Sequence, residues 1–141
     1  MTITFNKVET IPHDYKHLIS EDVLGEVFHS GASHKYIYGQ ESPVGVIAYT
    51  LDIVGGKTLP RFIHVSIDPK YRATEEVNNF LNLTELALLS EGYTQTFAAI
   101  EHNKKYMHKT AKYYGFKEYH KDDENIYYYK NIQVPQPQEK F

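Results

Sequence analysis

Cysteine and tryptophan are both absent from the 141 residues of the sequence. Without cysteine the chain can form no disulfide framework, no thiolate nucleophile and no zinc site that depends on cysteine, and the absence fits a reducing compartment. No segment resembles a signal peptide, and no apolar run approaches the roughly 20 residues that a membrane-spanning helix needs. We therefore expect a cytoplasmic protein with no membrane partner.

The chain also lacks an excess of positive charge. Its 15 lysine and arginine residues stand against 18 acidic residues, for a formal net charge of −3. A nucleic-acid-binding protein usually carries a basic surplus on one face. Here the basic residues gather only locally, at Lys104, Lys105, Lys109 and Lys112. We expect no nucleic-acid partner, and the sequence contains no P-loop, Rossmann fingerprint or Ser-His-Asp arrangement.

The composition that remains is that of an ordinary globular protein, with 41% hydrophobic residues, 23% charged residues and 13 tyrosines. A chain of this length is expected to bury roughly two-thirds of its unfolded surface. We predict a single domain over residues 1–132. Residues 133–141 (QVPQPQEKF) form a polar tail that contains proline and too few apolar residues to join a core. We expect this tail to contact a protein partner or a second copy of the chain.

Alternation of apolar and polar residues indicates a series of strands in the first half of the chain. Strands are predicted at residues 2–9, 34–38, 44–53 and 61–67. A helical region is predicted at residues 13–28, either unbroken or divided at Gly25 or at the cluster of residues 20–22. The pair Gly55-Gly56 lies between two alternating runs with no helix directly after it. We interpret it as a hairpin turn and not as a phosphate-binding loop. The last three strands therefore form an antiparallel meander.

The second half of the chain mixes helical and strand patterns. Helices are predicted over residues 74–91 and 103–114, each followed directly by a glycine that ends it. The continuous apolar run at residues 96–100 indicates a strand buried on both faces. Residues 116–120 and 125–130 flank a polar turn and form a terminal hairpin. This order of elements indicates an α/β fold of the α+β kind.

One pair of histidines has a spacing that metal sites use. His13 and His17 lie four residues apart in the predicted helical region, beside Asp14 and Glu21. No third ligand converges on them in the sequence. We interpret them as part of an exposed polar face and predict no metal.

Two segments of the sequence carry a resemblance to a known family. The first is Val65-Ser66-Ile67-Asp68-Pro69-Lys70-Tyr71-Arg72, and the second is Glu101-His102-Asn103 with the later Tyr113-Tyr114-Gly115-Phe116. In these segments the chain resembles the GNAT superfamily of acetyl-CoA-dependent N-acetyltransferases, and the resemblance covers nearly its whole length. It implies a mixed, mostly antiparallel sheet with helices on both faces. It also implies a V-shaped cleft between the strands at residues 61–67 and 96–100, where the pantetheine arm of acetyl-CoA would bond to the strand edges.

The resemblance further implies which residues bind acetyl-CoA and which accept a proton. The cosubstrate would be held by Val65, Ile67, Arg72, Ala73, Thr74 and Asn103, with Arg72 and backbone N–H groups at the pyrophosphate. His64 is the candidate base, near the middle of its strand and on a face that we expect it to share with Phe62 and Ser66. A histidine accepts a proton at neutral pH. The alternative is a histidine satisfied by neighbouring side chains.

The general acid of the family is a tyrosine four residues before the glycine of the Gly-Phe ending, where it protonates the CoA thiolate. This chain has Ala111 at that position. Tyr106, Tyr113 or Tyr114 is therefore the candidate donor. A tyrosine, with an ordinary pKa of about 10, is a suitable acid for a thiolate if it is correctly placed.

The pyrophosphate loop departs from the family pattern. The family places two glycines where this chain has Glu75 and Val77, and a side chain there removes the close backbone approach that glycine allows. A carboxylate beside a pyrophosphate adds repulsion of about 1 kcal/mol at a protein surface. Thr74 is instead a good N-cap, and glutamates in a first helical turn offset the helix dipole. The loop is thus degenerate as a phosphate site.

Two functional hypotheses stay open from the sequence. The first is an N-acetyltransferase in which an amine attacks acetyl-CoA directly. The second is a GNAT-like protein without catalytic activity that acts by binding, for example a virion-associated or host-inhibitory protein of a bacteriophage. The short chain and its style, rich in Tyr, Asn and Lys and without Cys and Trp, resemble those of phage proteins; its location would then be the host cytoplasm or the virion.

Overall fold

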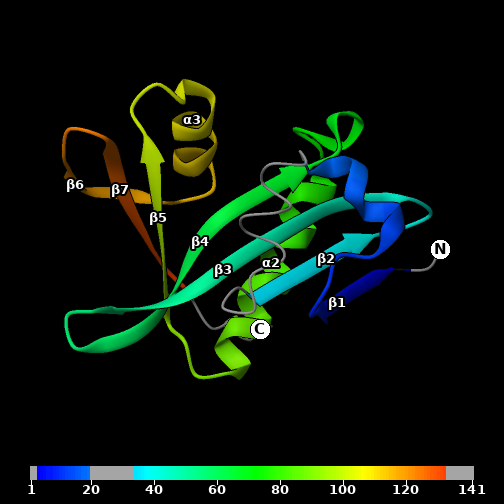
Figure 1. The fold of residues 1–141 in the computed structure, drawn as a ribbon, viewed down its shortest axis with the longest axis horizontal. Coiled ribbons are helices and arrows are strands. Elements are labelled where there is room, and N and C mark those ends of the chain that lie inside the picture. Colours follow the sequence, from blue (N-terminus) through cyan, green and yellow to red (C-terminus); the bar gives the residue numbers. More distant parts are fainter. Residues whose placement is uncertain (1–2, 20–33, 133–141) are drawn as a thin grey trace, which may run out of the picture.

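The computed structural model describes residues 3–19 and 34–132. Within these residues seven strands form one sheet in the order β1-β2-β3-β4-β5-β7-β6 (Figure 1). The strands are β1 (Thr4–Val8), β2 (His34–Gly39), β3 (Pro43–Val54), β4 (Lys57–Ile67), β5 (Gln95–Glu101), β6 (Lys117–Lys121) and β7 (Asn125–Asn131). The helical elements are η1 (His13–Leu18), η3 (Pro69–Tyr71), α2 (Glu75–Ser90) and α3 (Lys105–Tyr113). None of these helices is long and apolar enough to cross a membrane.

Neighbouring strands are antiparallel except at the centre of the sheet, where β4 and β5 run parallel. The predicted strands and the terminal hairpin are confirmed, with ends that differ by a few residues. The predicted hairpin turn is confirmed as well, because Val54 pairs with Lys57 across it. Gly55 and Gly56 both have positive φ angles, of 58° and 81°. Two consecutive positive φ angles are what a two-residue turn needs to match the twist of its strands.

Alternating side chains of the sheet build two separate cores. On one face, α2 packs against a cluster that includes Tyr38, Ile47, Phe80 and Leu88. On the other face, η1 covers a smaller cluster that consists of Ile11, Tyr15, Ile19, Ile37, Val46 and Ala48. Helices therefore lie on both faces of the sheet, as the resemblance implied. Buried apolar area of this kind is the main favourable term in folding.

Close packing of α2 on the sheet depends on one glycine. A Cβ atom added at Gly45 would lie 2.7 Å from Ile67 Cδ1 and 2.9 Å from the ring of Phe80. Phe80 is fully buried, and its ring stacks on Tyr38 at 5.4 Å. The missing side chain of Gly45 therefore lets the α2 helix approach β3.

The helical region predicted at residues 13–28 is described only over its first part. There the chain forms the 3-10 helix His13–Leu18, with Tyr15 buried against the sheet. The remainder of that prediction, and the predicted tail at residues 133–141, lie outside the described residues.

The predicted helix at residues 74–91 is confirmed as α2, but the predicted capping role of Thr74 is wrong. Thr74 occupies the N-cap position, yet its side chain makes no capping hydrogen bond. The hydroxyl instead donates to the carbonyl oxygen of Tyr71 at 2.5 Å. The preceding 3-10 turn η3 brings this carbonyl within reach, so that the local bond replaces the cap. Glu75 and Glu76 do lie in the first turn of α2.

A β-bulge in β4 changes which side chains share a face. Ala48 pairs with His64, whereas the next residue of β3, Tyr49, pairs with Phe62, so that Ile63 is an extra residue in β4. A bulge of this kind interrupts the alternation of side chains. The expectation that His64 shares a face with Phe62 is therefore wrong.

The two faces of β4 can be assigned from its partners. Phe62 belongs to the core beneath α2. His64 and Ser66 lie opposite Ala48 and Val46, which belong to the cluster beneath η1. The bulge thus turns the histidine to the η1 face of the sheet.

Burial of β5 also differs from the prediction. Thr96 and Phe97 are buried, but the following residues, Ala98 to Ile100, are only half-buried. The β5 strand diverges from its neighbour β4 at this point, and residues Ala98 to Ile100 line a cavity. The prediction that residues 96–100 form a strand buried on both faces is therefore wrong for the second half of that segment.

Candidate active site

The β4 and β5 strands pair only over two residues near the middle of each strand. They pair at Arg61 with Phe97 and at Phe62 with Ala98, and they diverge beyond that point (Figure 1). The V-shaped cleft that the resemblance implied is therefore present. Among the described residues, divergence leaves backbone N–H and C=O groups along the facing edges without a strand partner, and such groups require other hydrogen-bonding partners.

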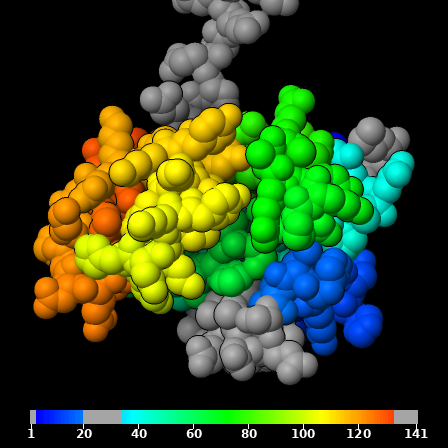
Figure 2. Space-filling view, turned by 90° about the horizontal axis from the view of Figure 1, so that it is seen from above, coloured from blue at the N-terminus to red at the C-terminus, as the bar shows by residue number. Residues whose placement is uncertain are grey.

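A cavity of about 330 Å³ fills the space between the diverging strands. Its wall is formed by the second halves of β4 and β5, by one side of α3 with the residues that follow it, and by the start of α2. Figure 2 shows the hollow between the yellow surface of β5 and α3 and the green surface of α2. We call this cavity the cleft. Its volume lies within the range of small-molecule binding sites.

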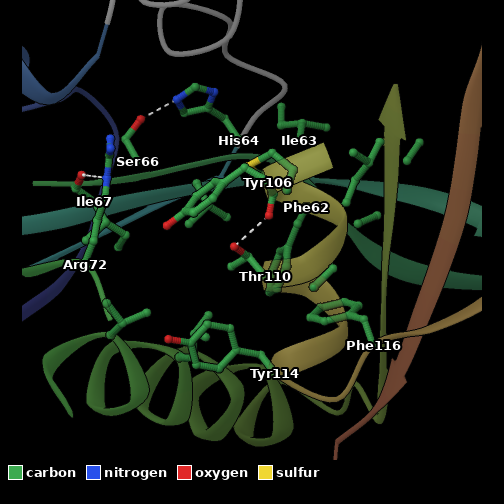
Figure 3. Close-up of a pocket in the computed structure, with 18 of the residues that line it drawn as sticks. Phe62, Ile63, His64, Ser66, Ile67, Arg72, Tyr106, Thr110, Tyr114 and Phe116 are labelled. Carbon is green, nitrogen blue, oxygen red and sulfur yellow. Dashed lines mark hydrogen bonds between the residues drawn. The ribbon is translucent and has the colours of Figure 1, made fainter. Parts of the chain in front are cut away.

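Two of the three candidate tyrosines reach the cleft. Tyr106 and Tyr114 line it, and both project from the α3 side toward Arg72 (Figure 3). Tyr113 is 77% exposed and does not line the cleft. Burial, followed by the neighbouring Tyr113 and Tyr106, raises the pKa of Tyr114. Tyr114 therefore keeps its proton at neutral pH and can donate it.

Three residues of α3 and its C-terminal end share the cleft. Tyr106, Thr110 and Tyr114 follow each other at intervals of four, and all three line the cleft. Residues four apart lie on one face of a helix. Thr110 also donates a hydrogen bond to the Tyr106 carbonyl oxygen at 3.0 Å. The helical interval could have identified Thr110, which sequence reasoning missed, but it does not exclude Tyr113, which lies seven residues after Tyr106 and is shown to be exposed only by the structure.

His64 lines the cleft together with Ser66. The His64 Nε2 atom is hydrogen-bonded to the Ser66 hydroxyl (Figure 3). Burial lowers the pKa of His64, so that the ring is neutral at pH 7. A neutral imidazole can accept a proton, as a general base must. Sequence reasoning placed Ser66 beside the histidine and assigned it no role.

Four of the six residues expected to hold acetyl-CoA line the cleft: Val65, Ile67, Arg72 and Ala73. Arg72 donates through Nε to the carbonyl oxygen of Ile67 at 3.3 Å, which holds the guanidinium beside the end of β4. Ala73 has a positive φ of 59°. This conformation is costly for a residue with a side chain, and such strain is concentrated at functional sites. The strained residue here lies directly before α2.

The other two residues, Thr74 and Asn103, do not line the cleft. Thr74 is bonded back to Tyr71, as described above. Asn103 lines a separate hollow that also includes Glu101 and Glu124. The structure therefore does not bring these two side chains together with the others.

The two glutamates at the start of α2 have different surroundings. Glu76 accepts hydrogen bonds from the Tyr38 hydroxyl at 2.8 Å and from Gln40 Nε2 at 2.5 Å. Its carboxylate is thus directed to β2, and it does not line the cleft. Glu75 is exposed and does not line the cleft either. Val77, at the second family glycine position, does line it.

No three acidic or histidine side chains among residues 3–19 and 34–132 come together as metal ligands. His17 lies 3.8 Å from the carboxylate of Asp68 instead. This contact links η1 to the turn that follows β4.

The mixed sheet with helices on both faces and the divergence of β4 from β5 fit a GNAT acyl-CoA N-acyltransferase fold, and solved structures show that fold. An IAA acetyltransferase from Bacillus cereus has a TM-score of 0.69 and 10% sequence identity, with 93% of this chain and 100% of that chain covered. No protein-family model matches the sequence, and no curated protein matches it.

Two further solved structures contain acetyl-CoA. A GNAT family acetyltransferase from Elizabethkingia anophelis has a TM-score of 0.69 at 12% identity and covers 92% of this chain and 98% of its own. An N-acetyltransferase from Campylobacter jejuni has a TM-score of 0.65 at 14% identity and covers 94% of this chain and 100% of its own. At these identities the likeness shows the fold, and the fold is that of GNAT proteins.

Proposed function

We propose that this protein is an N-acetyltransferase that moves an acetyl group from acetyl-CoA to an amine. The observation that carries the proposal is the divergence of β4 from β5 around a cavity lined by His64, Tyr106 and Tyr114. A neutral base and tyrosine hydroxyl groups thus face one space, as acyl transfer to an amine requires. The acetyl-CoA bound by two proteins of this fold supports the choice of cosubstrate.

Acetyl-CoA would bind along the cleft with its pantetheine arm against the free edge of β4, at Val65 and Ile67. Its pyrophosphate would lie at the start of α2, where the first N–H groups of a helix have no intrahelical partner. Arg72 and the backbone of Ala73 lie at this end of the cleft. The Glu76 carboxylate is held at β2 by Tyr38 and Gln40, so that it does not occupy the anion site.

In the chemical step the amine attacks the carbonyl carbon of the thioester. His64 accepts the proton that the amine loses, and a tyrosine hydroxyl of the cleft, Tyr114 or Tyr106, donates a proton to the departing thiolate. Because burial lowers the pKa of His64, the base should stay active at pH values below 6.5, the ordinary histidine value. The rate should therefore rise with pH through a midpoint below 6.5. A midpoint above it would exclude His64 as the base.

Titration calorimetry with acetyl-CoA tests the proposal directly. We expect binding in the micromolar range, and we expect Arg72→Ala to weaken it roughly tenfold, because a charge-assisted bond to phosphate is lost. Lys70→Ala is the matched control, since Lys70 is exposed and does not line the cleft. No heat and no thermal shift at millimolar acetyl-CoA would overturn the proposal.

One observation favours a second candidate, a GNAT-fold protein that binds a partner without transferring acetyl. Glu75 and Val77 stand at the two glycine positions of the family loop. Such a protein could be associated with a phage virion or inhibit a host protein, with residues 133–141 as a contact. The double variant Glu75→Gly, Val77→Gly separates the candidates. A double variant that binds acetyl-CoA when the natural chain does not would support this second candidate.

A further inference from the structure

The described residues that line the cleft carry little charge. Arg72 is the one lining residue among them with a permanent charge, and no aspartate or glutamate of the described ranges joins it. Most of the others are apolar, and four of these come from four different elements: Leu18 of η1, Ile63 of β4, Ile100 of β5 and Met107 of α3. The cleft therefore offers a bound molecule mainly apolar contact.

The path of the cosubstrate leaves one end of the cleft for the acceptor. With the pyrophosphate at Arg72 and the pantetheine arm along Ile67 and Val65, the arm runs back along β4 toward the bulge. The thioester at its tip then reaches His64 and Ile63. Figure 3 shows these two residues next to each other and away from Arg72.

The acceptor has to approach from the η1 face of the sheet. The bulge turns His64 to that face, and Leu18, at the end of η1, lines the cleft on the same side. Ile63 is 38% exposed although it lies within a strand of the sheet. An isoleucine exposed inside a cavity is apolar surface that a bound molecule can remove from water.

We infer that the acceptor is a primary amine on an apolar carbon skeleton with no second charged group, and that Leu18 and Ile63 contact this skeleton. The inference rests on the proposed function, since it needs acetyl-CoA in the cleft and His64 as the base. The transfer itself is unchanged. The amine nitrogen bonds to the carbonyl carbon, the carbon–sulfur bond breaks, the amine proton goes to His64, and a tyrosine protonates the thiolate.

Among the described lining residues no carboxylate could balance a second ammonium group on the acceptor. Glu101 follows Ile100 in β5 but lines the separate hollow, and Asp68, beside His17 of η1, does not line the cleft. A buried ammonium without a counter-charge is strongly disfavoured. The reacting amine is affected differently, because apolar surroundings lower the pKa of an amine and so favour the neutral nitrogen that attacks.

Two amines of equal length test the inference. Hexylamine and hexamethylenediamine share the same straight carbon chain and differ in one terminal ammonium group. With the full chain and saturating acetyl-CoA, CoA release is followed for each amine, and the acetylated amine is identified by mass. We expect kcat/KM for hexylamine to exceed that for the diamine at least about tenfold, the lower end of the discrimination that apolar pockets give.

A charge placed in the lining should reverse this preference. Ile63→Asp supplies a carboxylate at an exposed position and should lower the ratio of the two kcat/KM values at least about tenfold, mainly by raising the value for the diamine. Ile63→Asn is the matched control, because it has nearly the same shape without the charge, and it should leave the diamine unimproved. Because the ratio compares two amines on one preparation, partial unfolding of a variant cancels.

A second control separates the lining from the protein surface. Ile53→Asp places the same charge at a residue that is 80% exposed and does not line the cleft, and it should leave the ratio unchanged.

The outcomes distinguish this inference from the proposed function. Equal or better use of the diamine by the natural chain would overturn the inference and leave the proposed function standing. Binding of acetyl-CoA in calorimetry without transfer to hexylamine would do the same, as would equal responses to Ile63→Asp and Ile63→Asn. Absence of acetyl-CoA binding would overturn the proposed function and the inference with it.

Discussion

The β1–β4 part of the sheet and the β5–β7 part differ in how continuously their strands are paired. β3 and β4 pair from Gly45 with Ile67 to Val54 with Lys57, almost over their full lengths. Between β4 and β5 the pairing stops after two residues on each strand. Strand pairing is thus continuous in the first part of the sheet and is interrupted at the junction with the second part, where the cleft lies.

The two parts also differ in what covers them. The first part has a buried core beneath α2, with Tyr38, Tyr49 and Phe80 almost inaccessible. In the second part every residue of the edge strand β6 is exposed, and the fully buried side chains among the described residues are Thr96 and Tyr128. The free energy of folding is therefore concentrated in the first part, while the residues that line the cleft come from both sides of the junction. Substitutions in the two parts should separate stability from binding.

The largest expected loss of stability follows from Phe80→Ala in the first part. Phe80 is fully buried between Tyr38 and Gly45. Removing a buried aromatic ring costs about 3–5 kcal/mol through lost burial and the cavity left behind. Urea unfolding measures the change. Tyr113→Ala is the control, because Tyr113 is 77% exposed, and a loss of similar size there would contradict the division of stability.

A smaller loss is expected from Glu76→Ala. The substitution removes the acceptor of the Tyr38 hydroxyl, which is buried, and of Gln40 Nε2. Hydrogen bonds to a charged group contribute about 1.5–3 kcal/mol. Glu75→Ala should change the free energy of unfolding by no more than about 0.5 kcal/mol, since Glu75 is exposed. Equal effects at the two positions would mean that Glu76 is not tied to β2.

His108 tests the second part of the sheet. Its Nε2 atom lies 2.8 Å from the Glu101 carbonyl oxygen and its Nδ1 atom 2.7 Å from the Tyr128 hydroxyl. A carbonyl only accepts, so Nε2 donates, and in the neutral ring Nδ1 accepts from Tyr128. His108→Ala should cost about 1–2 kcal/mol.

The same variant tests whether the junction sets the shape of the cleft. Because His108 ties α3 to β5 and β7, its loss should also weaken acetyl-CoA binding in calorimetry, although His108 does not line the cleft. Lys109→Ala, exposed on the same helix, is the control. Unchanged affinity of His108→Ala for acetyl-CoA would show that the position of α3 does not depend on the hydrogen bonds of His108.

The smallest effect is expected at acid pH in the β6–β7 turn. The Tyr127 hydroxyl, followed by the N–H groups of Asn125 and Glu124, lowers the pKa of Asp122 to about 2. A carboxyl whose pKa is lower in the folded state stabilises the fold above its ordinary pKa of 3.8 and loses this contribution as pH falls toward 2. Tyr127→Phe should reduce the pH dependence of unfolding in this window. No difference between the two proteins would contradict the assignment.

Much of the fold was predictable because its signals are local. The Gly55-Gly56 turn, the alternating strands on either side of it and the helix that ends before Gly92 follow from backbone preference and periodicity. The segment from Val65 to Arg72, together with the later residues from Glu101 to Phe116, carried the family resemblance. These features need no knowledge of what packs against them.

Individual site residues were less predictable. The orientation of His64 depends on the extra residue Ile63, and a bulge leaves no mark in the alternation of a strand whose faces are both covered. Val65, Ile67, Arg72 and Ala73 line the cleft, whereas Thr74 and Asn103 do not. Side-chain direction at a loop depends on neighbours that are distant in the sequence.

The sequence by itself determined that the chain would form a mixed sheet with a helix soon after the Asp68-Pro69 turn. The signals for these elements are the alternation of strand residues, the spacing of apolar helix residues and the glycines at helix ends, and each of them lies within a short segment. Only the tertiary structure decided what that helix does at its start. Tyr38 of β2 and the nearby Gln40 hold Glu76 away from the cleft, and the β4 bulge turns His64 away from the face of Phe62. Both outcomes depend on which strands pair and in what register, and long-range pairing is not encoded in any single segment.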